Sequence, residues 1–369
     1  MASSDRMTAA KFLVAALCAT GIVTGFNFAI DPLQIFRPAQ FYKPAYPSEE
    51  RMHNAGLIRS QQFDTVFMGD SIALHVRPSE VDSILGCHAV KLVMSGAGSR
   101  EQNFVLGMAL ARHPRRVLWE MNDMQFGDSA DIDDLPYFPA DLYRKNLKGI
   151  AGYLFNLETS REAVWSILPS WKALQKLRFA LMRAGYLKYD KDDPNELNTI
   201  DPALVPAAYN VKRSLAAYEY YGRPGNGQRF SAGYSYDALV SNFERDAVQF
   251  IEAHPETNFT IYFPPYAMVQ YAAMRDFGAS DMLSTFYRFS AYALQRLSQL
   301  PNATVFDFRD DSELSHNLDN FADAIHHSPA IGLLLLSRVS KGENLVDKAD
   351  PTRSIERLKQ QIDAYKLPQ

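Results

Sequence analysis

The residues best suited to chemistry are Gly69-Asp70-Ser71, which directly follow the short apolar run Thr65–Met68. An apolar run that ends in a glycine-led turn predicts a buried strand with Ser71 at its carboxyl end. Sites form at that edge of an open α/β sheet, and a helix starting after Ser71 would direct unpaired N–H groups toward a bound group. The pattern fits a serine nucleophile that faces developing negative charge. On these three residues alone, the simpler interpretation, in which Asp70 or Ser71 caps a helix, is favoured.

Three further polar pieces follow later predicted strands. They favour the interpretation of Ser71 as a nucleophile over the capping interpretation. Because the carboxyl ends of parallel strands meet at one edge of a sheet, all four pieces are expected to lie close together. A single polar piece after a strand is weak evidence for a site, whereas four such pieces at one edge of the sheet indicate one. The three additional pieces are Ser95–Ser99, Glu120–Asp123 and Asp323–His326.

These residue types match the needs of acyl transfer. A serine hydroxyl such as that of Ser71 is a poor nucleophile until a base such as His326 removes its proton. The histidine needs an acceptor that holds its tautomer, and Asp323 lies three residues earlier, within reach from the same turn. The developing oxyanion needs hydrogen-bond donors. The backbone N–H groups of Ser71 and Gly96 and the side-chain amide of Asn122 could supply them.

The four pieces resemble the motifs of the SGNH (GDSL-type) hydrolases. That family carries Gly-Asp-Ser, a glycine after the second strand, an asparagine after the third, and a late Asp-x-x-His. The resemblance implies a flavodoxin-like three-layer α/β/α sandwich with Ser71 as nucleophile, His326 as base and Asp323 as its orienting partner. It implies Gly96 and Asn122 as oxyanion-hole donors together with Ser71. It covers residues 65–339 except for a long insertion.

The chain departs from the family at the third piece, where Glu120 replaces the usual glycine and puts the position of Asn122 in doubt. The layout is also similar to envelope proteins with one N-terminal anchor, of the teichoic-acid D-alanylation and alginate or cellulose O-acetylation types. The Asp-x-x-His-His-Ser-Pro-x-x-Gly run of residues 323–332 resembles the end of such chains.

Four more residues are candidates for substrate contacts, and each has a structural alternative. Asp70 precedes the serine, and His75, one turn later, lines the site or occupies a surface helix. Tyr266 follows the fourth predicted strand in Phe263-Pro264-Pro265-Tyr266, where a rigid turn explains the prolines equally well. His327 is better explained as a cap or cleft residue than as a second base.

Strands that alternate with helical patterns predict an α/β fold with a parallel five-stranded sheet. Helices are expected at Arg100–Arg112 and Ala330–Val339. The five predicted strands are Asp64–Met68, Ala89–Met94, Arg116–Met121, Asn258–Phe263 and Thr304–Phe308.

Residues 12–30 contain no charged side chain, and as a helix they would rise about 28 Å, close to the hydrocarbon thickness of a bilayer. We interpret this segment as a single-pass anchor of the cytoplasmic membrane, with residues 1–11 in the cytoplasm and the catalytic domain outside. A cleaved signal peptide is the alternative. Residues 31–62 are expected to form a stiff, proline-rich lead-in.

The expected hydrolase domain covers residues 63–340 and includes a long helical insertion at residues 127–241. The insertion opens with an acidic patch that lacks the spacing of a calcium-binding loop, so it is interpreted as a solvated face. Its end is rich in tyrosine and glycine, and we expect it to cover the Ser71 edge and select a glycan. Residues 341–369 should form a charged, exposed amphipathic helix. The tyrosines proposed for glycan contact are Tyr218, Tyr220, Tyr221 and Tyr234.

The composition excludes some classes of function but does not indicate an activity. The chain has 369 residues and a formal net charge of −4, which gives no electrostatic footprint for nucleic acid. Its two cysteines, Cys18 and Cys87, have no partners at metal-ligand spacing. We therefore expect neither a metal nor a cofactor.

The sequence thus favours an anchored serine esterase or O-acyltransferase acting on acyl groups of an extracytoplasmic polysaccharide. Its partners would be that glycan or an acyl donor, the membrane, and other membrane proteins of a polysaccharide synthesis complex. Two alternatives stay open. One is a non-catalytic glycan-binding or assembly subunit with an idle triad, and the other is a lipase-like esterase that acts on membrane lipids.

Overall fold

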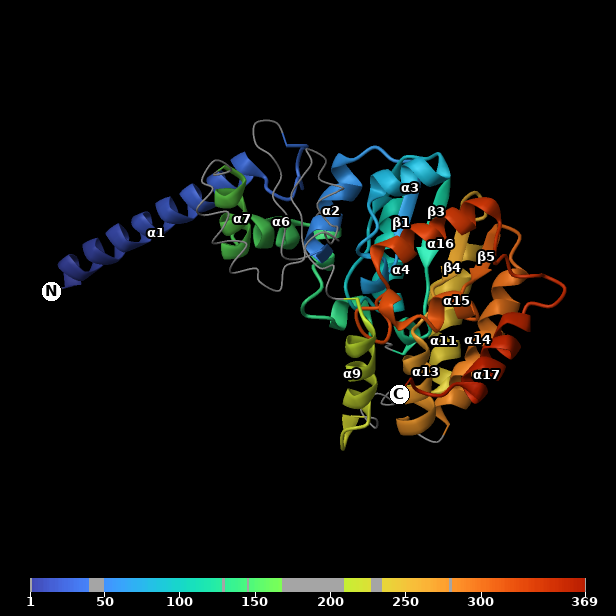
Figure 1. The fold of residues 1–369 in the computed structure, drawn as a ribbon. Coiled ribbons are helices and arrows are strands. Elements are labelled where there is room, and N and C mark those ends of the chain that lie inside the picture. The colour runs from blue at the N-terminus through green and yellow to red at the C-terminus, as the bar shows by residue number, and fades with distance from the viewer. Residues whose placement is uncertain are drawn as a thin grey trace. The chain divides into compact units, whose positions relative to one another are not determined.

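The computed structural model describes residues 2–39, 50–127, 130–144, 146–167, 209–226, 234–278 and 281–368 (Figure 1). The chain forms two compact units. The anchor unit comprises Met1–Gln61, Pro136–Gly185 and Tyr189–Leu197, and the sheet unit comprises Gln62–Leu135, Tyr186–Lys188 and Asn198–Gln369. Of the described residues, 136–167 of the long insertion group with the N-terminal helix.

The sheet unit contains a five-stranded sheet with all neighbouring strands parallel, as predicted. The strand order is β2-β1-β3-β4-β5, so the chain moves outward from β1 to β2 and then crosses back to β3. The carboxyl ends of β1 and β3 therefore flank the point where the strand order reverses, where ligands bind in open α/β sheets. The strands are β1 (Thr65–Met68), β2 (Ala89–Lys91), β3 (Arg116–Glu120), β4 (Asn258–Phe263) and β5 (Ala303–Asp307).

The side chains of the strands alternate between two packed faces. Leu118 of β3 belongs to an apolar cluster with residues of α3 (Pro78–Leu85) and α16 (Pro329–Lys341). Its neighbour Trp119 donates from Nε1 to Gln102 Oε1 of α4 (Ser99–Leu110) at 2.7 Å. The two expected helices are confirmed as α4 and α16, each with slightly different ends.

Further helices complete the sheet unit. The C-terminal segment, expected as an exposed helix, has one buried face formed by Ile355, Leu358 and Ile362 of α17. The remaining α-helices are α9 (Val211–Tyr221), α11 (Tyr236–Phe243), α12 (Gln249–Glu252), α13 (Met268–Phe277), α14 (Met282–Ser298), α15 (Ser312–Ser315) and α17 (Arg353–Ala364). Single 3₁₀ turns form η1 (Ser71–Ala73), η2 (Met124–Phe126), η3 (Ile132–Asp134) and η7 (Leu318–Asn320), and η6 (Glu244–Val248) is a π-helix.

The anchor unit is helical. Residues Arg6–Ile30 of α1 (Ala2–Ile30) are long and apolar enough to cross a membrane, with a mean hydropathy of 1.9. The lead-in is not an extended spacer throughout, because it contains a helix, α2. Residues 40–49 of its proline-rich part lie outside the described residues. The other helices of this unit are α2 (Glu50–Ser60), α5 (Ala140–Tyr143), α6 (Leu147–Leu154) and α7 (Leu157–Ile167).

Candidate active site

Ser71 lies at the carboxyl end of β1, where the sequence places it. The helix expected after it is only the 3₁₀ turn η1, and Asp70 caps that turn by accepting from the Ile72 N–H at 2.9 Å. Gly69 makes the turn possible, because a Cβ there would lie 2.9 Å from Glu120 Oε2. Asp70 is therefore the residue that caps the turn, and the Ser71 side chain contacts other partners.

Ser71, His326 and Asp323 form one chain of hydrogen bonds. Ser71 Oγ lies 2.8 Å from His326 Nε2, and His326 Nδ1 lies 2.7 Å from Asp323 Oδ2. The serine and the histidine are 255 positions apart in the sequence. This order of atoms is the one that a base-activated serine requires.

The loop that carries His326 is fixed by its own backbone. Asp323 Oδ1 accepts from the N–H groups of Ile325, at 2.8 Å, and His326, at 2.9 Å, so the carboxylate organises the turn as well as the imidazole. The Ala322 N–H donates to the His326 carbonyl at 2.8 Å, and the Ala324 carbonyl accepts from the Ala267 N–H at 3.0 Å. The loop is therefore tied both to itself and to the segment after β4.

The charge of Asp323 sets the protonation of this pair. Burial lowers the pKa of His326, but the hydrogen bond and charge of Asp323 outweigh it and hold the pKa above its ordinary value of 6.5. For Asp323, burial raises the pKa, whereas the hydrogen bonds and charge of His326 bring it below its ordinary value of 3.8. The carboxylate thus favours the imidazolium that forms when a serine loses its proton.

The three expected oxyanion donors differ in their surroundings. Gly96 adopts a φ of +61°, a left-handed conformation that suits glycine, in the turn after β2. Among the described residues, the backbone N–H groups of Ser71 and Gly96 donate to no acceptor. The amide of Asn122 is engaged, because Nδ2 donates to Asp70 Oδ2 at 2.7 Å and to Glu120 Oε1 at 3.4 Å.

Glu120 is the residue at which the third polar piece departs from the motif that it resembles. Its side chain is fully buried at the end of β3, and Oε2 accepts from the Asp70 N–H at 3.1 Å. Burial and the neighbouring charge of Asp70 raise the pKa of Glu120 well above its ordinary value. A buried carboxyl in this position ties together Asp70 and Asn122, a link that a glycine could not make.

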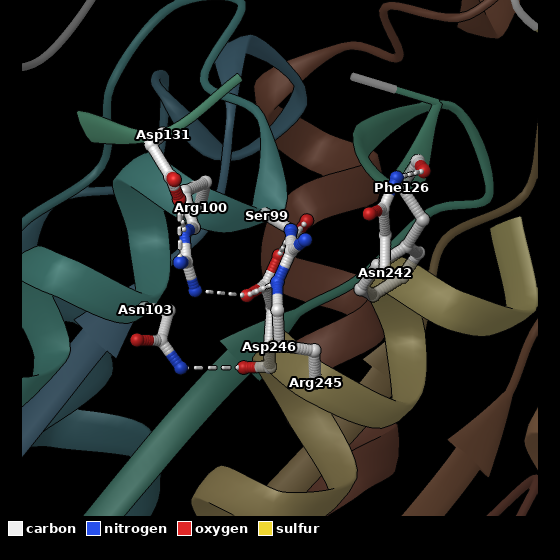
Figure 2. A network of polar contacts seen from close by, with 8 residues as sticks. All are labelled: Ser99, Arg100, Asn103, Phe126, Asp131, Asn242, Arg245 and Asp246. Atoms are coloured by element: carbon white, nitrogen blue, oxygen red, sulfur yellow. Dashed lines mark hydrogen bonds and ion pairs between the residues drawn. The ribbon is translucent and has the colours of Figure 1, made fainter. Parts of the chain in front are cut away.

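A second polar network supports the turn that contains Gly96. Figure 2 shows Asp246 of η6 beneath the first residues of α4. The Asp246 carboxylate accepts from Ser99 Oγ at 2.8 Å and from Arg100 at 3.0 Å, and its carbonyl accepts from Asn103 Nδ2 at 2.8 Å. Arg245 pairs with the same carboxylate at 2.7 Å. The network ties the start of α4, directly after the Gly96 turn, to the helix that precedes β4.

Three of the four expected substrate contacts are buried side chains instead. His75 and His327 pack ring against ring with centroids 4.8 Å apart. Burial lowers the pKa of both, to about 4 for His327, so they are neutral core residues. Tyr266 is buried and donates to Asp123 Oδ1 at 3.3 Å. The fourth, Asp70, lies between Ser71 and Asn122.

Sequence reasoning missed the environment of Asp123, the residue after Asn122. Its carboxylate accepts from Tyr266 and from Tyr234, and both tyrosines are buried. Burial raises the pKa of Asp123 above its ordinary value. Its adjacency to Asn122 was the only signal in the sequence. Tyr234, expected as a glycan contact, is therefore part of the support for the end of β3.

Among the described residues, no group of three or more histidine, cysteine, aspartate or glutamate side chains could hold a metal ion. Asp131 of the acidic patch pairs with Arg100 at 2.6 Å, whereas Asp128 lies outside the described residues. The thiol of Cys87 is half-buried, and burial raises its pKa to about 11, so it is a weak nucleophile.

Comparison with known proteins adds no relative. No protein-family model matches the chain, and no curated protein sequence matches it. An activity is therefore inferred from the geometry of the site.

Proposed function

We propose that the chain is a serine esterase or O-acyltransferase of the SGNH type, with Ser71 as nucleophile, His326 as base and Asp323 as its orienting partner. The observation that carries the proposal is the hydrogen-bonded chain from Ser71 Oγ through His326 to Asp323 at the carboxyl edge of the sheet. Ser71 and His326 are 255 positions apart in the sequence, yet their side chains meet in the order that proton transfer requires. This arrangement argues that the two residues act in one reaction.

The proposed reaction has two halves. His326 Nε2 takes the proton of Ser71 Oγ as that oxygen attacks the ester carbonyl. The N–H groups of Ser71 and Gly96, with the Asn122 amide that Asp70 positions, stabilise the oxyanion. Collapse of the tetrahedral intermediate breaks the ester bond, and the proton on His326 passes to the leaving alkoxide. In the second half, water or a sugar hydroxyl attacks the acyl-serine and His326 takes its proton. The bond from the acyl carbon to Ser71 Oγ then breaks, the acyl group stays on the acceptor, and His326 returns the proton to Ser71 Oγ.

The fold supports this assignment. The strand order β2-β1-β3-β4-β5 is the order of flavodoxin-like sheets, and helices pack on side chains of both orientations along β3. We therefore propose a flavodoxin-like three-layer arrangement. The hydrogen bond between the Gly-Asp-Ser turn and the Asp-x-x-His loop, from Ser71 to His326, supports the proposal.

The proposed substrate is an acyl group, such as acetyl, on a cell-envelope polysaccharide outside the cytoplasmic membrane. The apolar helix α1 supports attachment to that membrane. Helix α9 packs against Ala324 and Ile325 of the His326 loop and carries Tyr220, whose ring is half-exposed. An exposed tyrosine on a helix that packs against this loop can stack on a sugar ring and hydrogen-bond to it.

The test is covalent labelling of the full-length protein in detergent with a fluorophosphonate probe, followed by hydrolysis of an acetyl ester. We expect the wild type to be labelled and the Ser71→Ala variant to lose both labelling and hydrolysis. Ser337→Ala is the matched control, because Ser337 of α16 is also half-buried but belongs to none of the four polar pieces. It should retain both activities.

Two results would overturn the proposal. One is a folded wild type that neither reacts with the probe nor cleaves esters, which would favour the non-catalytic glycan-binding alternative. The other is equal labelling of Ser71→Ala and wild type. Cleavage of phospholipid esters but not of acetylated glycans would instead support the lipase-like alternative.

A further inference from the structure

We propose that two consecutive helices, α6 and α7, insert into the bilayer surface at the membrane boundary where α1 ends. They are joined by Phe155 and Asn156 and are called the α6–α7 hairpin below. The proposal requires that α1 crosses a membrane, and it adds a second membrane-binding element that the sequence did not indicate. It concerns the anchor unit alone and is independent of the reaction proposed for Ser71.

The length of α1 is the first reason to place the hairpin at the bilayer. Its charge-free run extends over residues 12–30, about 28 Å of helix, close to the ~30 Å hydrocarbon thickness of a bilayer. Within that charge-free run, residues 12–22 are exposed throughout and span about 16 Å. From Val23 onward, α1 packs against the folded unit, with Asn27 and Ile30 buried. If α1 crosses the bilayer, the structure packed on its last two turns enters the bilayer with it.

That structure is the α6–α7 hairpin, which lies beside the C-terminal part of α1 (Figure 1). Asn27 Nδ2 donates to the Leu154 carbonyl at 2.7 Å and to Ser160 Oγ at 2.9 Å. These bonds place the corner between α6 and α7 at the depth of Asn27, one turn before the end of α1. They also satisfy the amide donors of a polar side chain that would be costly to expose to lipid.

Helices α6 and α7 and the turn between them present large apolar side chains to their surroundings. Leu157 is 88% exposed, Leu147 at the start of α6 is 85% exposed and Phe155 is 61% exposed. Leucine and phenylalanine side chains this exposed are unusual in water and are typical of surfaces that meet a membrane. Further exposed apolar residues of this unit are Phe28, Val164 and Ile167.

Helix length and charge restrict the hairpin to the interface. Helices α6, with eight residues, and α7, with eleven, are too short to cross a bilayer. Lys148 is exposed and pairs with Asp141 at 2.7 Å, and Arg161 pairs with Glu158. Paired charges beside exposed leucines fit the boundary between acyl chains and headgroups, where long basic side chains reach water.

The test places an environment-sensitive fluorophore on single cysteines of the full-length protein in phosphatidylethanolamine–phosphatidylglycerol vesicles. Leu157→Cys and Phe155→Cys are made in a background that carries Cys18→Ser and Cys87→Ser. Both positions are exposed, so the substitutions spare the core. Vesicles with brominated acyl chains should quench both probes about twofold or more relative to unbrominated vesicles.

Two further variants serve as references. The native Cys18, in a Cys87→Ser background, reports whether α1 lies in the bilayer, because Cys18 is exposed within the apolar run. Leu345→Cys places the probe on an exposed leucine of the sheet unit and measures quenching that is not specific to the hairpin.

Quenching at positions 155 and 157 above that of Leu345→Cys supports the proposal. If Cys18 is quenched and the hairpin positions are not, the hairpin proposal is wrong although the anchor is present. If Cys18 is not quenched either, the premise fails and the proposal falls with it. Disulfide-linked dimers of unlabelled Leu157→Cys without lipid quenching would show instead that this face joins two copies of the chain.

Discussion

Asn122 Nδ2 donates a hydrogen bond of 2.7 Å to Asp70 Oδ2, so the residue before the candidate nucleophile holds the amide expected in the oxyanion hole. The amide also contacts Glu120 at 3.4 Å. Asp70 and Glu120 thus position Asn122, and two N–H groups, of Ser71 and Gly96, are the donors that the resting site leaves unpaired among the described residues.

The first prediction distinguishes the residue that binds the oxyanion, Asn122, from the residue that positions Asn122, Asp70. Asn122→Ala should lower kcat for a small ester by about 10²–10³-fold, the usual cost of losing one oxyanion donor. Asp70→Ser keeps an acceptor for the Ile72 N–H and removes the oxygen that binds Asn122. It should cost less than Asn122→Ala and add nothing to it in the double variant. Independent, additive losses in kcat would contradict the positioning role.

The second prediction concerns pH. His326 must be neutral to accept a proton, and Asp323 raises its pKa, so kcat/KM should rise with pH through a midpoint above 6.5. Asp323→Asn removes the charge, so the midpoint should move to lower pH while kcat falls roughly 10²–10⁴-fold. The measurement is the pH profile of ester hydrolysis for both proteins. An unchanged midpoint would show that His326 is not the titrating base.

The third prediction uses Glu120. Its pKa is raised in the folded protein, so the protonated carboxyl is favoured there, and stability is lost as pH rises above the ordinary pKa of 4.5. Glu120→Gln imitates the protonated form and keeps an oxygen for the Asp70 N–H. The Tm of the variant relative to wild type should therefore increase from about pH 5 to about pH 8. A Tm difference that is constant over this range would mean that Glu120 is not the cause.

The fourth prediction tests the packing behind the site. A Cβ on Gly332 of α16 would lie 2.4 Å from His75 Nε2, so Gly332→Ala should destabilise the fold by about 1–3 kcal/mol. Adding His75→Ala makes room, and the double variant should be more stable than the sum of the single effects predicts. Gly107→Ala in α4 is the control, because its Cβ would meet only Phe250 at 3.8 Å. Urea unfolding of the wild type, the two single variants, the double variant and the control measures these differences.

The fifth prediction concerns substrate choice. Tyr220 is the one of the four proposed tyrosines that is exposed. Tyr218 donates to Asp276 at 2.8 Å, Tyr221 is partly buried against the cluster that contains Ala324, and Tyr234 is buried. Tyr220→Ala should preserve turnover of a small acetyl ester and reduce deacetylation of an acetylated polysaccharide several-fold, because only the polymer would reach α9. Tyr220→Phe should lose less. Equal loss on both substrates, together with a lower Tm, would assign the residue to the core.

The local patterns of the sequence determined much of the fold. Apolar runs closed by polar turns located all five strands to within three residues at each end, because burial of a parallel strand demands such runs. The contact between Asp323 and His326 was also accessible, since residues three apart in one turn reach each other. The positions of Ser71 and Gly96 at strand ends followed from the same patterns.

Contacts between distant segments were decided only by the tertiary structure. His75, Tyr266 and His327 looked like cleft residues because polar and aromatic types do not reveal whether their neighbours bury them, and packing against α16 and Asp123 placed them inside. Asn122 was placed correctly along the chain, but its amide partner Asp70 lies 52 positions away. The described part of the long insertion divides between the two units, and residues 136–167 group with α1. The apolar residues of α6 and α7 did not reveal their packing against α1, because hydrophobicity along a chain shows which residues leave water and not which surface covers them.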